Sequence, residues 1–306
     1  MKKAFNYIFT TVFLLHFAFL GVIFALNYET IVHSKVAFSM DKKIKVEQDD
    51  ELRDFGPLKE NEKAEKVPVL MYHRIIADED LTSVHRDENG KIYDTIVTVN
   101  QFKEQMKFLH DNNFTTLTLK EFEAFMDKKL DVPEKSVYIT FDDGFKDNYA
   151  NAYPVLNEYG FKATIFLITG NIDKKPRDYD PSDAQYLSHE DITKGSNVFN
   201  YASHTHKFHE KDENNEAFLV SKDKKSITKD LEKSIKIIGD NTAFAYPFGA
   251  YDDETLDILK QQGVKIAFTV IDKGMAHPSD DFLQIPRRGI YPSTTIDIFK
   301  NLVTYD

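Results

Sequence analysis

The stretch 138–156, "YITFDDGFKDNYANAYPVL", places two aspartates side by side at the point where a run of strand-forming residues ends. The apolar run 137–141 predicts a buried strand, and the pattern of 147–159 predicts a helix after it. Asp142 and Asp143 lie between the two elements. Like charges in contact are costly unless a cation or a proton relieves them, so the rest of the sequence has to supply a group that relieves this pair.

Apolar runs of strand length alternate with helical patterns on both sides of this stretch. Strands are expected at 67–72, 137–141, 163–168, 198–202, 243–246 and 264–270, and helices at 100–112, 147–159, 227–238, 252–262 and 294–303. Strand–helix alternation over about 240 residues predicts an α/β domain with a parallel sheet or barrel and helices outside. In such folds the functional groups gather at the carboxyl ends of the strands.

The N-terminal residues 1–26 are expected to be a signal-anchor segment. Two lysines precede 19 residues, 8–26, that carry no formal charge, and a membrane-spanning helix needs roughly 20 apolar residues. No Ala-x-Ala cleavage motif follows, so a single-pass anchor with the folded domain outside the cell is favoured over a cleaved and secreted form. Residues 27–66 are expected to form a charged extracytoplasmic linker and 67–306 the folded domain, because 41–66 is too charged to bury much surface.

Composition excludes several classes of function. The chain has 306 residues and a formal charge of −11, which argues against a nucleic-acid backbone as partner. It has no cysteine, which excludes disulfides, thiolate metal ligands and a cysteine nucleophile. It has no tryptophan, so stacking on a ligand would fall to its 25 phenylalanines and 15 tyrosines.

Several polar groups follow the predicted strands. They are His73, the aspartate pair, the three histidines 204, 206 and 209, the segment "AYPFG" at 245–249, and Arg287 with Arg288. If each lies at the carboxyl end of its strand, all of them face one common mouth. Two imidazoles and one carboxylate form a three-ligand site for a divalent metal, and His204, His209 and Asp143 could supply it. Asp142 would then be free to act as a general base.

Each of these motifs has a plainer explanation when it is taken alone. An Asp-Asp-Gly sequence after a strand is often a turn and a helix cap, and "AYPFGAYDDE" is most simply a turn before a helix. Three histidines within six residues are compatible with a solvated loop. A lone histidine is more often structural, and an arginine pair is more often on the surface. The matched placement of all these groups after strands favours the functional interpretation.

The motifs "TFDDG", "SHTHKFH", "AYPFG" and "IPRR" resemble those of the polysaccharide deacetylase family, the NodB-homology carbohydrate esterases, over about residues 67–303. Three features are more similar to the intercellular-adhesion branch, which N-deacetylates poly-β-1,6-N-acetyl-D-glucosamine in biofilms. The histidines at 204 and 209 are five residues apart, where most of the family has a spacing of four. Ala245 stands where most members have arginine. The segment "VLMYH" stands at the front of the domain, as in the circularly permuted members, and no leucine-x-histidine motif occurs near the C-terminus.

The resemblance implies a distorted, incomplete (β/α)7 barrel that holds a divalent metal ion. Zinc is the first expectation for the metal, with cobalt, nickel and iron as alternatives. The family's ligands correspond here to Asp143, His204 and His209.

The resemblance also implies the catalytic roles. Asp142 would be the general base, Arg287 would orient it, His73 would be the general acid, and the backbone N–H of Phe248 would donate to the oxyanion. Two points stay open, namely which of the two adjacent arginines faces the site and what role His206 has.

The expected activity is metal-dependent removal of N-acetyl groups from an extracellular N-acetylglucosamine polymer, with the β-1,6-linked polymer favoured. A deacetylase of peptidoglycan or chitin-type glycans is an alternative, and so is a non-catalytic, membrane-tethered glycan-binding protein. The expected partners are the polysaccharide and, through the N-terminal helix, the membrane; a monomer is expected. Tyr72, Tyr246 and Phe248 are the candidates for sugar stacking.

Overall fold

The computed structural model describes residue 44, residues 51–272 and residues 274–304. The predicted anchor at 1–26 lies outside these described residues. Within the described part of the chain, no helix has both the length and the apolar character needed to cross a bilayer.

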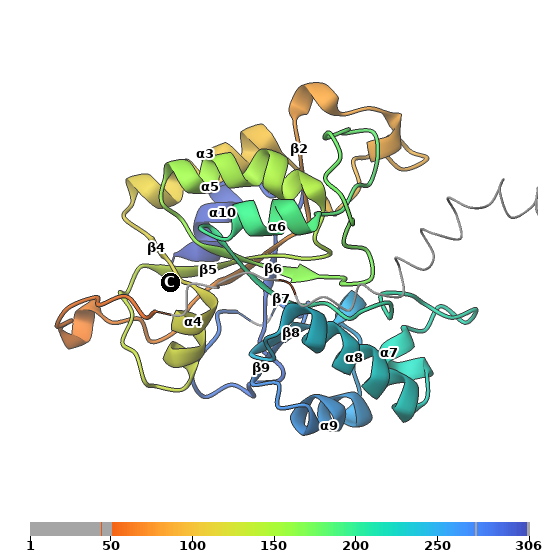
Figure 1. Ribbon diagram of the computed structural model, residues 1–306. Helices are drawn as coiled ribbons and strands as arrows, with labels where there is room; N and C mark the ends of the chain where they lie inside the picture. Colours follow the sequence, from red (N-terminus) through yellow and green to blue (C-terminus); the bar gives the residue numbers. More distant parts are fainter. Residues whose placement is uncertain (1–43, 45–50, 273, 305–306) are drawn as a thin grey trace, which may run out of the picture. The chain divides into compact units, whose positions relative to one another are not determined.

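A curled sheet of parallel strands forms the centre of the domain (Figure 1). The strands are β1 (Val69–Tyr72), β4 (Thr115–Thr116), β5 (Ser136–Phe141), β6 (Ala163–Leu167), β7 (Phe199–Ser203), β8 (Ala243–Ala245), β9 (Ile266–Phe268) and β10 (Arg288–Gly289). Their order is β10-β1-β5-β6-β7-β8-β9, with β4 paired to the start of β5. A parallel bridge between Phe268 and Ile285 joins β9 to the segment that leads into β10. The predicted α/β architecture is therefore observed as a curled half-barrel.

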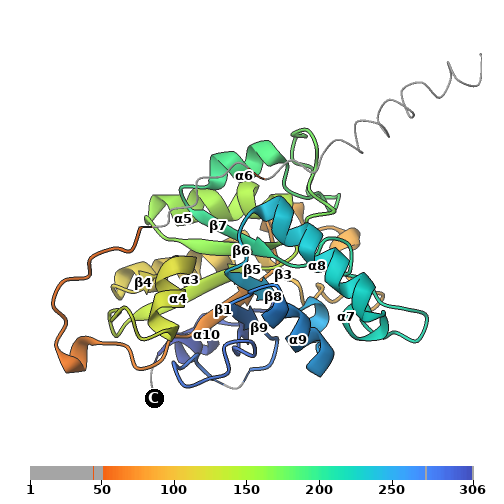
Figure 2. The same ribbon diagram turned by 60° about the horizontal axis from the view of Figure 1, so that its bottom comes forward.

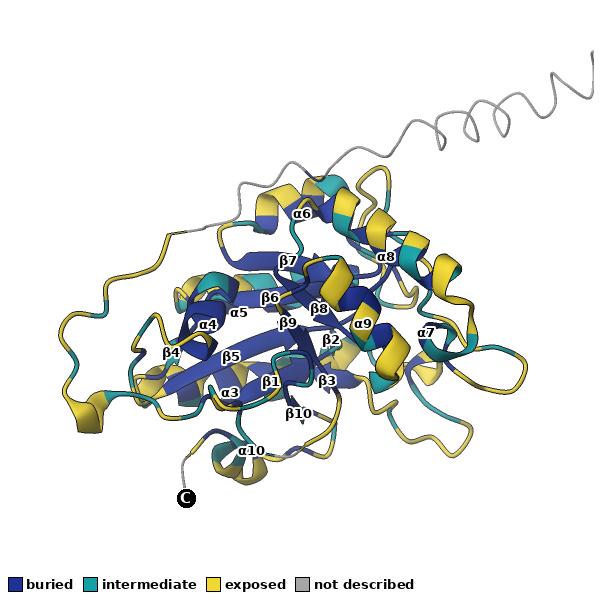
Figure 3. Ribbon diagram, turned by 90° about the horizontal axis from the view of Figure 1, so that it is seen from below, coloured by how far each residue is buried: buried dark blue, intermediate teal, exposed yellow. Residues whose placement is uncertain are grey.

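Continuous apolar runs explain the central strands. Every residue of β5, β6 and β7 is buried, as expected for parallel strands that are covered on both faces. Figure 3 shows the strands as buried and the outward helix faces as exposed.

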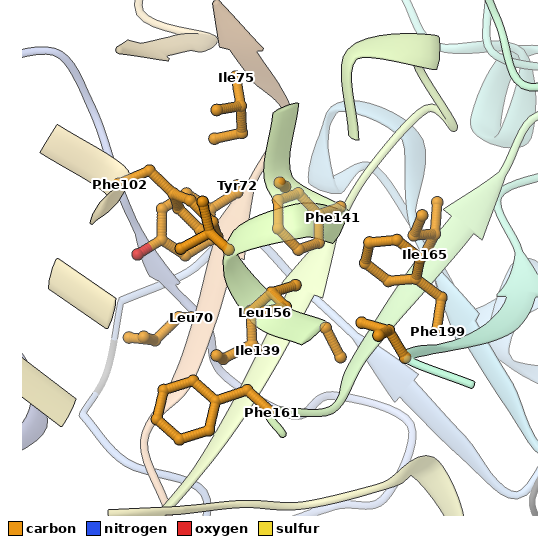
Figure 4. Close-up of a cluster of buried hydrophobic side chains, with 14 of the residues drawn as sticks. Leu70, Tyr72, Ile75, Phe102, Ile139, Phe141, Leu156, Phe161, Ile165 and Phe199 are labelled. Atoms are coloured by element: carbon orange, nitrogen blue, oxygen red, sulfur yellow. The ribbon is translucent and has the colours of Figure 1, made fainter. Parts of the chain in front are cut away.

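The buried side chains form clusters on both faces of the sheet. Tyr72, Phe102 and Phe141 belong to a cluster between the sheet and the helices outside it (Figure 4). On the other face, Phe268 of β9 lies 5.8 Å from Tyr138 of β5, measured between ring centroids. Because these two strands are not neighbours in the sheet, the second cluster fills the concave side of the curl.

Helices pack around the sheet, and one of them, which begins at Leu119, contributes Phe122 to the cluster on the concave side. They are α3 (Val99–Asp111), α4 (Leu119–Met126), α5 (Tyr153–Glu158), α6 (His189–Gly195), α7 (Phe218–Ser221), α8 (Lys224–Ile238), α9 (Asp253–Gln261) and α10 (Ile296–Val303). Six of them begin after a residue whose side chain accepts a backbone N–H of the first turn, namely Thr98, Thr118, Ser188, Asp223, Asp252 and Thr295. The helices α4 and α7 were not predicted from the sequence.

The predicted helix at 147–159 is divided in two. Its first part is a π-helical turn, Asn148–Ala152, and its second part is α5. Pro154 explains the change, since proline has no N–H to donate to the carbonyl four residues earlier.

Two long polar segments, residues 78–95 and 171–188, contact each other. A ring nitrogen of His85, Nε2, lies 2.8 Å from the carbonyl oxygen of Pro181. The first segment connects β2 (Arg74–Ile76) and β3 (Ile96–Thr98), which pair with each other in a small parallel sheet that the sequence did not predict.

Residues 51–66 of the predicted linker run along the side of the domain that carries β4 and α4 (Figure 2, red to orange), and Arg53 and Ala64 form hydrogen bonds with it. Arg53 donates hydrogen bonds from Nε and Nη2 to the fully buried carboxylate of Glu121, at 2.7 and 2.6 Å. Ala64 donates its N–H to the carbonyl of Val132. Arg53 and Ala64, both in the segment expected to be a linker, are therefore bound to the domain, although no residue of 51–66 is buried. High charge did not prevent ordering, because one of these charges has a buried partner in α4.

Candidate active site

The end of β5 carries a buried ion pair. Asp142 follows the last residue of β5 and donates its N–H to the carbonyl of Tyr72 on the neighbouring strand β1. Arg287 donates from Nη1 to Oδ1 and from Nη2 to Oδ2 of Asp142, both at 2.7 Å. Arg287 is itself held by the carbonyl of Thr269, which accepts from Nε at 2.9 Å, and by Thr140 Oγ1 at 3.3 Å.

This pairing keeps Asp142 ionised. Burial alone would raise the pKa of the carboxyl group, since Asp142 is only 2% exposed. The positive charge of Arg287, supported by His204 and His73, outweighs burial and holds the pKa well below its usual range. A carboxylate that is ionised and fixed by two parallel hydrogen bonds is suited to accept a proton in a defined direction.

The structure answers which of the two adjacent arginines faces the site. Arg287 is fully buried and contacts Asp142. Arg288 points away from it, and its Nη1 donates to the carbonyl of Leu302 at 3.0 Å. Neighbouring residues of an extended segment point to opposite sides, so only one of them could enter the site.

Asp143 has an unusual backbone conformation. Its φ is +72°, and Gly144 after it has a φ of +79°. The left-handed region is unfavourable for a residue with a side chain, and it turns Asp143 away from the direction of β5. Glycine is favoured at 144, because φ there is positive and a Cβ would lie 2.7 Å from Cδ2 of Leu167, whose side chain would have to move. The "DDG" motif is therefore a sharp turn that presents the two carboxylates differently.

The predicted metal ligands come together. One ligand atom from each of Asp143, His204 and His209 lies within 4.8 Å of the others. Oδ1 of Asp143 is 3.1 Å from Nε2 of His209 and 3.5 Å from Nε2 of His204. Two ligands at about 2.0–2.1 Å from a tetrahedral ion lie about 3.3 Å apart, so these separations suit a divalent metal.

The bonding of these side chains also fits a metal. Oδ1 of Asp143 is buried and forms no hydrogen bond within the described residues, although the two imidazole nitrogens are near it. Buried polar atoms are rarely left without a partner, and a ligand to this oxygen would remove the deficit. Nearby imidazoles, His209 first, outweigh the effect of burial and lower the pKa of Asp143, so the carboxyl is ionised as a ligand must be.

His204 is prepared for ligation by its surroundings. Its Nδ1 lies 2.8 Å from the carbonyl oxygen of Ala245, which fixes the proton on Nδ1 and leaves Nε2 free to bind. Burial lowers the pKa of His204 to about 4, so the ring is neutral near pH 7. A ring with its second nitrogen bonded to a carbonyl is the usual arrangement of a metal-binding histidine.

His73 follows β1 and lies beside the two aspartates. The ring is near enough to both carboxyl groups for its charge to lower the pKa of Asp142 and that of Asp143. Its backbone carbonyl accepts a hydrogen bond from Nδ2 of Asn148, at 2.7 Å. The structure therefore brings His73 to the carboxylates, at the same edge of the sheet.

Phe248 lies in the turn after β8, beside His209. The two rings are 4.5 Å apart, and Phe248 is 45% exposed with a φ of +57°. Tyr72 and Tyr246, the other stacking candidates, are fully buried in the core, so the structure contradicts that expectation for both. Their hydroxyl groups bind Gln105 and the carbonyl of Leu283.

Sequence reasoning missed two side chains that support the site, Thr140 and Asn148. Thr140 lies two residues before Asp142, so strand periodicity could have placed it on the same side as the Asp142 carboxylate. Asn148 follows "DDG" in "FKDNY", but nothing in the sequence connects it to the carbonyl of His73.

Comparisons with known proteins agree with this geometry. The family model described as polysaccharide deacetylase matches residues 129–267. That range includes the three metal-ligand candidates, whereas His73 and Arg287 lie outside it. The chain is 31% identical over 259 residues to the poly-β-1,6-N-acetyl-D-glucosamine N-deacetylase of Staphylococcus aureus, and the alignment covers 82% of this chain and 86% of that protein.

Two solved structures are similar in fold. The Streptococcus pyogenes deacetylase PplD, solved in complex with acetate, has a TM-score of 0.64 and 26% identity, and the match covers 78% of this chain and 99% of that one. IcaB from Ammonifex degensii has a TM-score of 0.63 and 23% identity, with 79% and 99% covered. At that identity the second likeness supports the fold alone.

Proposed function

The chain belongs to the polysaccharide deacetylase family, and from this premise we propose that it removes N-acetyl groups from poly-β-1,6-N-acetylglucosamine with the help of a divalent metal ion. The observation that carries the proposal is the pairing of two unlike aspartates. Asp142 is ionised and bound to Arg287, while Asp143 converges with two imidazoles and keeps one oxygen without a hydrogen bond.

The metal is assigned to Asp143, His204 and His209. Two nitrogens and one oxygen suit zinc, and cobalt, nickel and iron accept the same ligands. When bound, such an ion would polarise the acetyl carbonyl and lower the pKa of the attacking water.

The protein's own groups then carry the protons. Asp142 accepts a proton from the water as the water oxygen attacks the carbonyl carbon of the N-acetyl group. The N–H of Phe248 donates to the carbonyl oxygen as negative charge develops there, and losing one such donor typically costs about 3 kcal/mol. His73 donates a proton to the amide nitrogen as the C–N bond breaks. Acetate and a free amine are the products.

The proposed polymer follows from the relatives and from the surface of the site. The S. aureus relative is named for poly-β-1,6-N-acetyl-D-glucosamine and is aligned with most of this chain. Phe248 offers an exposed ring next to His209, on which the apolar face of a sugar could pack. The formal charge of −11 disfavours binding to anionic polymers.

We further propose that the enzyme acts outside the cell and is held at the membrane by residues 1–26, as a monomer. The support is the uncharged run 8–26 after two lysines. Protease treatment of intact cells, followed by detection of the intact chain, tests this. Protection of the whole chain from the protease would contradict an external domain.

The experiment that tests the reaction measures acetate release by the full-length protein from β-1,6-linked and β-1,4-linked N-acetylglucosamine pentamers. It is done before chelation, after chelation and after return of Zn²⁺ or Co²⁺. Release from the β-1,6 pentamer that is lost on chelation and restored by metal is the expected result. Release from the β-1,4 pentamer alone would move the substrate to chitin-type or wall glycans, and release that is insensitive to chelation would contradict the metal.

A further inference from the structure

The two histidine ligands are carried by one short loop, residues 204–209, which we call the histidine loop. It follows β7 and turns sharply at Thr205, whose φ is +74°. A left-handed conformation is unfavourable for a β-branched residue, and Thr205 is fully buried. The loop therefore does not hold this shape by its own preference, and contacts from outside it must stabilise the conformation.

Helix α8 provides the main contact. Asp230 is 7% exposed and accepts the backbone N–H of His206 at Oδ1 and that of Lys207 at Oδ2, both at 2.8 Å. Successive backbone N–H groups after a left-handed residue form a concavity that binds an anion. The carboxylate of Asp230 fills this concavity in the middle of the histidine loop.

A second residue of α8 lies one turn further along the helix. Oγ of Ser234 donates to the carbonyl of Thr205 at 3.1 Å and lies 2.7 Å from Oγ of Ser203. Positions 230 and 234 are on the same face of a helix, so α8 contacts the loop through two adjacent turns.

The segment after β6 holds the other side of the loop. Thr169 donates its N–H to the carbonyl of Thr205 at 3.0 Å, and Gly170 donates to the carbonyl of His206 at 2.8 Å. A Cβ at Gly170 would lie 2.3 Å from that carbonyl oxygen, so only glycine permits the approach. The side chain of His206 contacts Thr169, with Nδ1 3.0 Å from Oγ1. His206 is thus part of the support of the loop and is not in the cluster of ligand atoms.

We infer that Asp230 is a positioning residue for the metal site, assisted by Ser234. By binding two consecutive N–H groups between His204 and His209, Asp230 fixes the loop conformation in which both Nε2 atoms approach Oδ1 of Asp143. The inference rests on the metal site proposed above, but its test does not require that the polymer assignment is right.

The test compares three variants of the full-length protein. Asp230→Asn keeps the size of the side chain but turns an amide NH₂ toward one of the two N–H groups. Ser234→Ala removes the second contact. Glu232→Gln is the control. Glu232 is exposed on the same helix, and its substitution removes one negative charge, as Asp230→Asn does. The affinity for Zn²⁺ is measured by competition with a chromophoric chelator, the geometry by the absorption spectrum of bound Co²⁺, and folding of the metal-free protein by circular dichroism.

Asp230→Asn is expected to weaken Zn²⁺ binding by about 10–100-fold and to change the Co²⁺ spectrum, as is typical when the support of a metal ligand is lost. Ser234→Ala is expected to weaken binding less, and Glu232→Gln to bind like the wild type. Zn²⁺ affinity of folded Asp230→Asn within twofold of the wild type would overturn the inference.

If Asp230→Asn does not fold, unchanged affinity of Ser234→Ala overturns the inference instead, and weakened affinity supports it. A wild-type protein that binds neither metal would overturn it together with the metal site. Loss of Zn²⁺ affinity in the variants, with no acetate release from either pentamer by the wild type, would leave this inference standing and contradict the proposed function.

Discussion

Arg287 and Asp142 are joined by two hydrogen bonds of 2.7 Å, and both side chains are almost completely buried. Burying two charges costs solvation energy, and such a pair is often no more stabilising than well-packed apolar residues. The pair is better explained by its effect on Asp142, which it keeps ionised at the carboxyl end of β5. The effect of Arg287 on the ionisation of Asp142 is therefore expected to appear in the pH dependence of the reaction rate.

Replacement of Arg287 by lysine should move the acidic limb of the pH–rate profile upward. In the wild type the pKa of Asp142 lies well below its usual range, so its carboxylate stays ionised at all but very low pH. Lysine cannot form the two parallel bonds, and burial then raises the pKa of Asp142. The measurement is kcat/KM against pH, with Arg288→Lys as the control because Arg288 points away from the site.

The same pair makes a prediction about stability, with the sign set by the lowered pKa of Asp142. Its contribution is present above the unfolded-state pKa, about 3.9, and is lost as the pH falls through the folded-state value. Arg287→Met leaves a buried charge without a partner and should lower the free energy of unfolding at pH 7 by about 3–5 kcal/mol. The loss should become smaller on acidification, as Asp142 takes up a proton. A loss that is independent of pH would contradict this assignment.

Phe248→Ala should raise the KM for the pentamer and have little effect on the stability of the fold. The exposed ring beside His209 is proposed to pack against a sugar, which is worth about 1 kcal/mol, or roughly a fivefold rise in KM for the pentamer. Phe248→Leu keeps an apolar side chain but removes the aromatic ring, so it distinguishes an effect of the ring from an effect of apolar volume. Ile298→Ala is the surface control, since Ile298 is similarly exposed on α10. An unchanged KM in Phe248→Ala would remove the ring from substrate binding.

Residues 51–66 should contribute to the stability of the domain. Glu121 is fully buried, and although burial favours its neutral form, the bond with Arg53 outweighs burial and lowers its pKa. Arg53→Ala should therefore destabilise by about 1–3 kcal/mol at pH 7, a modest figure because Arg53 itself is 40% exposed at the side chain. A chain of residues 67–306 should melt at a lower temperature than one of residues 51–306.

Lowering the pH should reduce the difference in melting temperature between the chain of residues 67–306 and the chain of residues 51–306. The stabilisation from a lowered pKa is lost as the pH falls through the folded-state pKa of Glu121, whereas in Arg53→Ala burial raises that pKa. Lys59→Ala is the control, because its ion pair with Glu62 is exposed and should contribute nothing measurable. Equal melting temperatures of the two truncated chains would show that the segment adds no stability.

The strand ends were predictable because two features of the sequence indicate them. Continuous apolar runs such as the one before Asp142 indicate buried parallel strands, and polar motifs follow them directly. The convergence of Asp143, His204 and His209 then follows from the shared direction of the strands.

The remaining features depend on contacts that no local pattern carries. Periodicity tells that Arg287 and Arg288 point to opposite sides, but not which of them points inward. Arg53 binds a glutamate 68 positions away, so the charged composition of its segment gave no sign of order. The role of His206 depended likewise on Asp230, in a helix that the sequence placed correctly but could not orient.

The most direct test of the account is a comparison of Asp142→Asn with Asp143→Ala, in which acetate release from the β-1,6 pentamer and bound Zn²⁺ are measured on the same samples. Asp142→Asn should lose about 10²–10⁴-fold in kcat, the usual contribution of a general base, and retain the metal. Asp143→Ala should lose both. A near-normal rate in Asp142→Asn, or loss of the metal from that variant, would contradict the division of labour between the two aspartates.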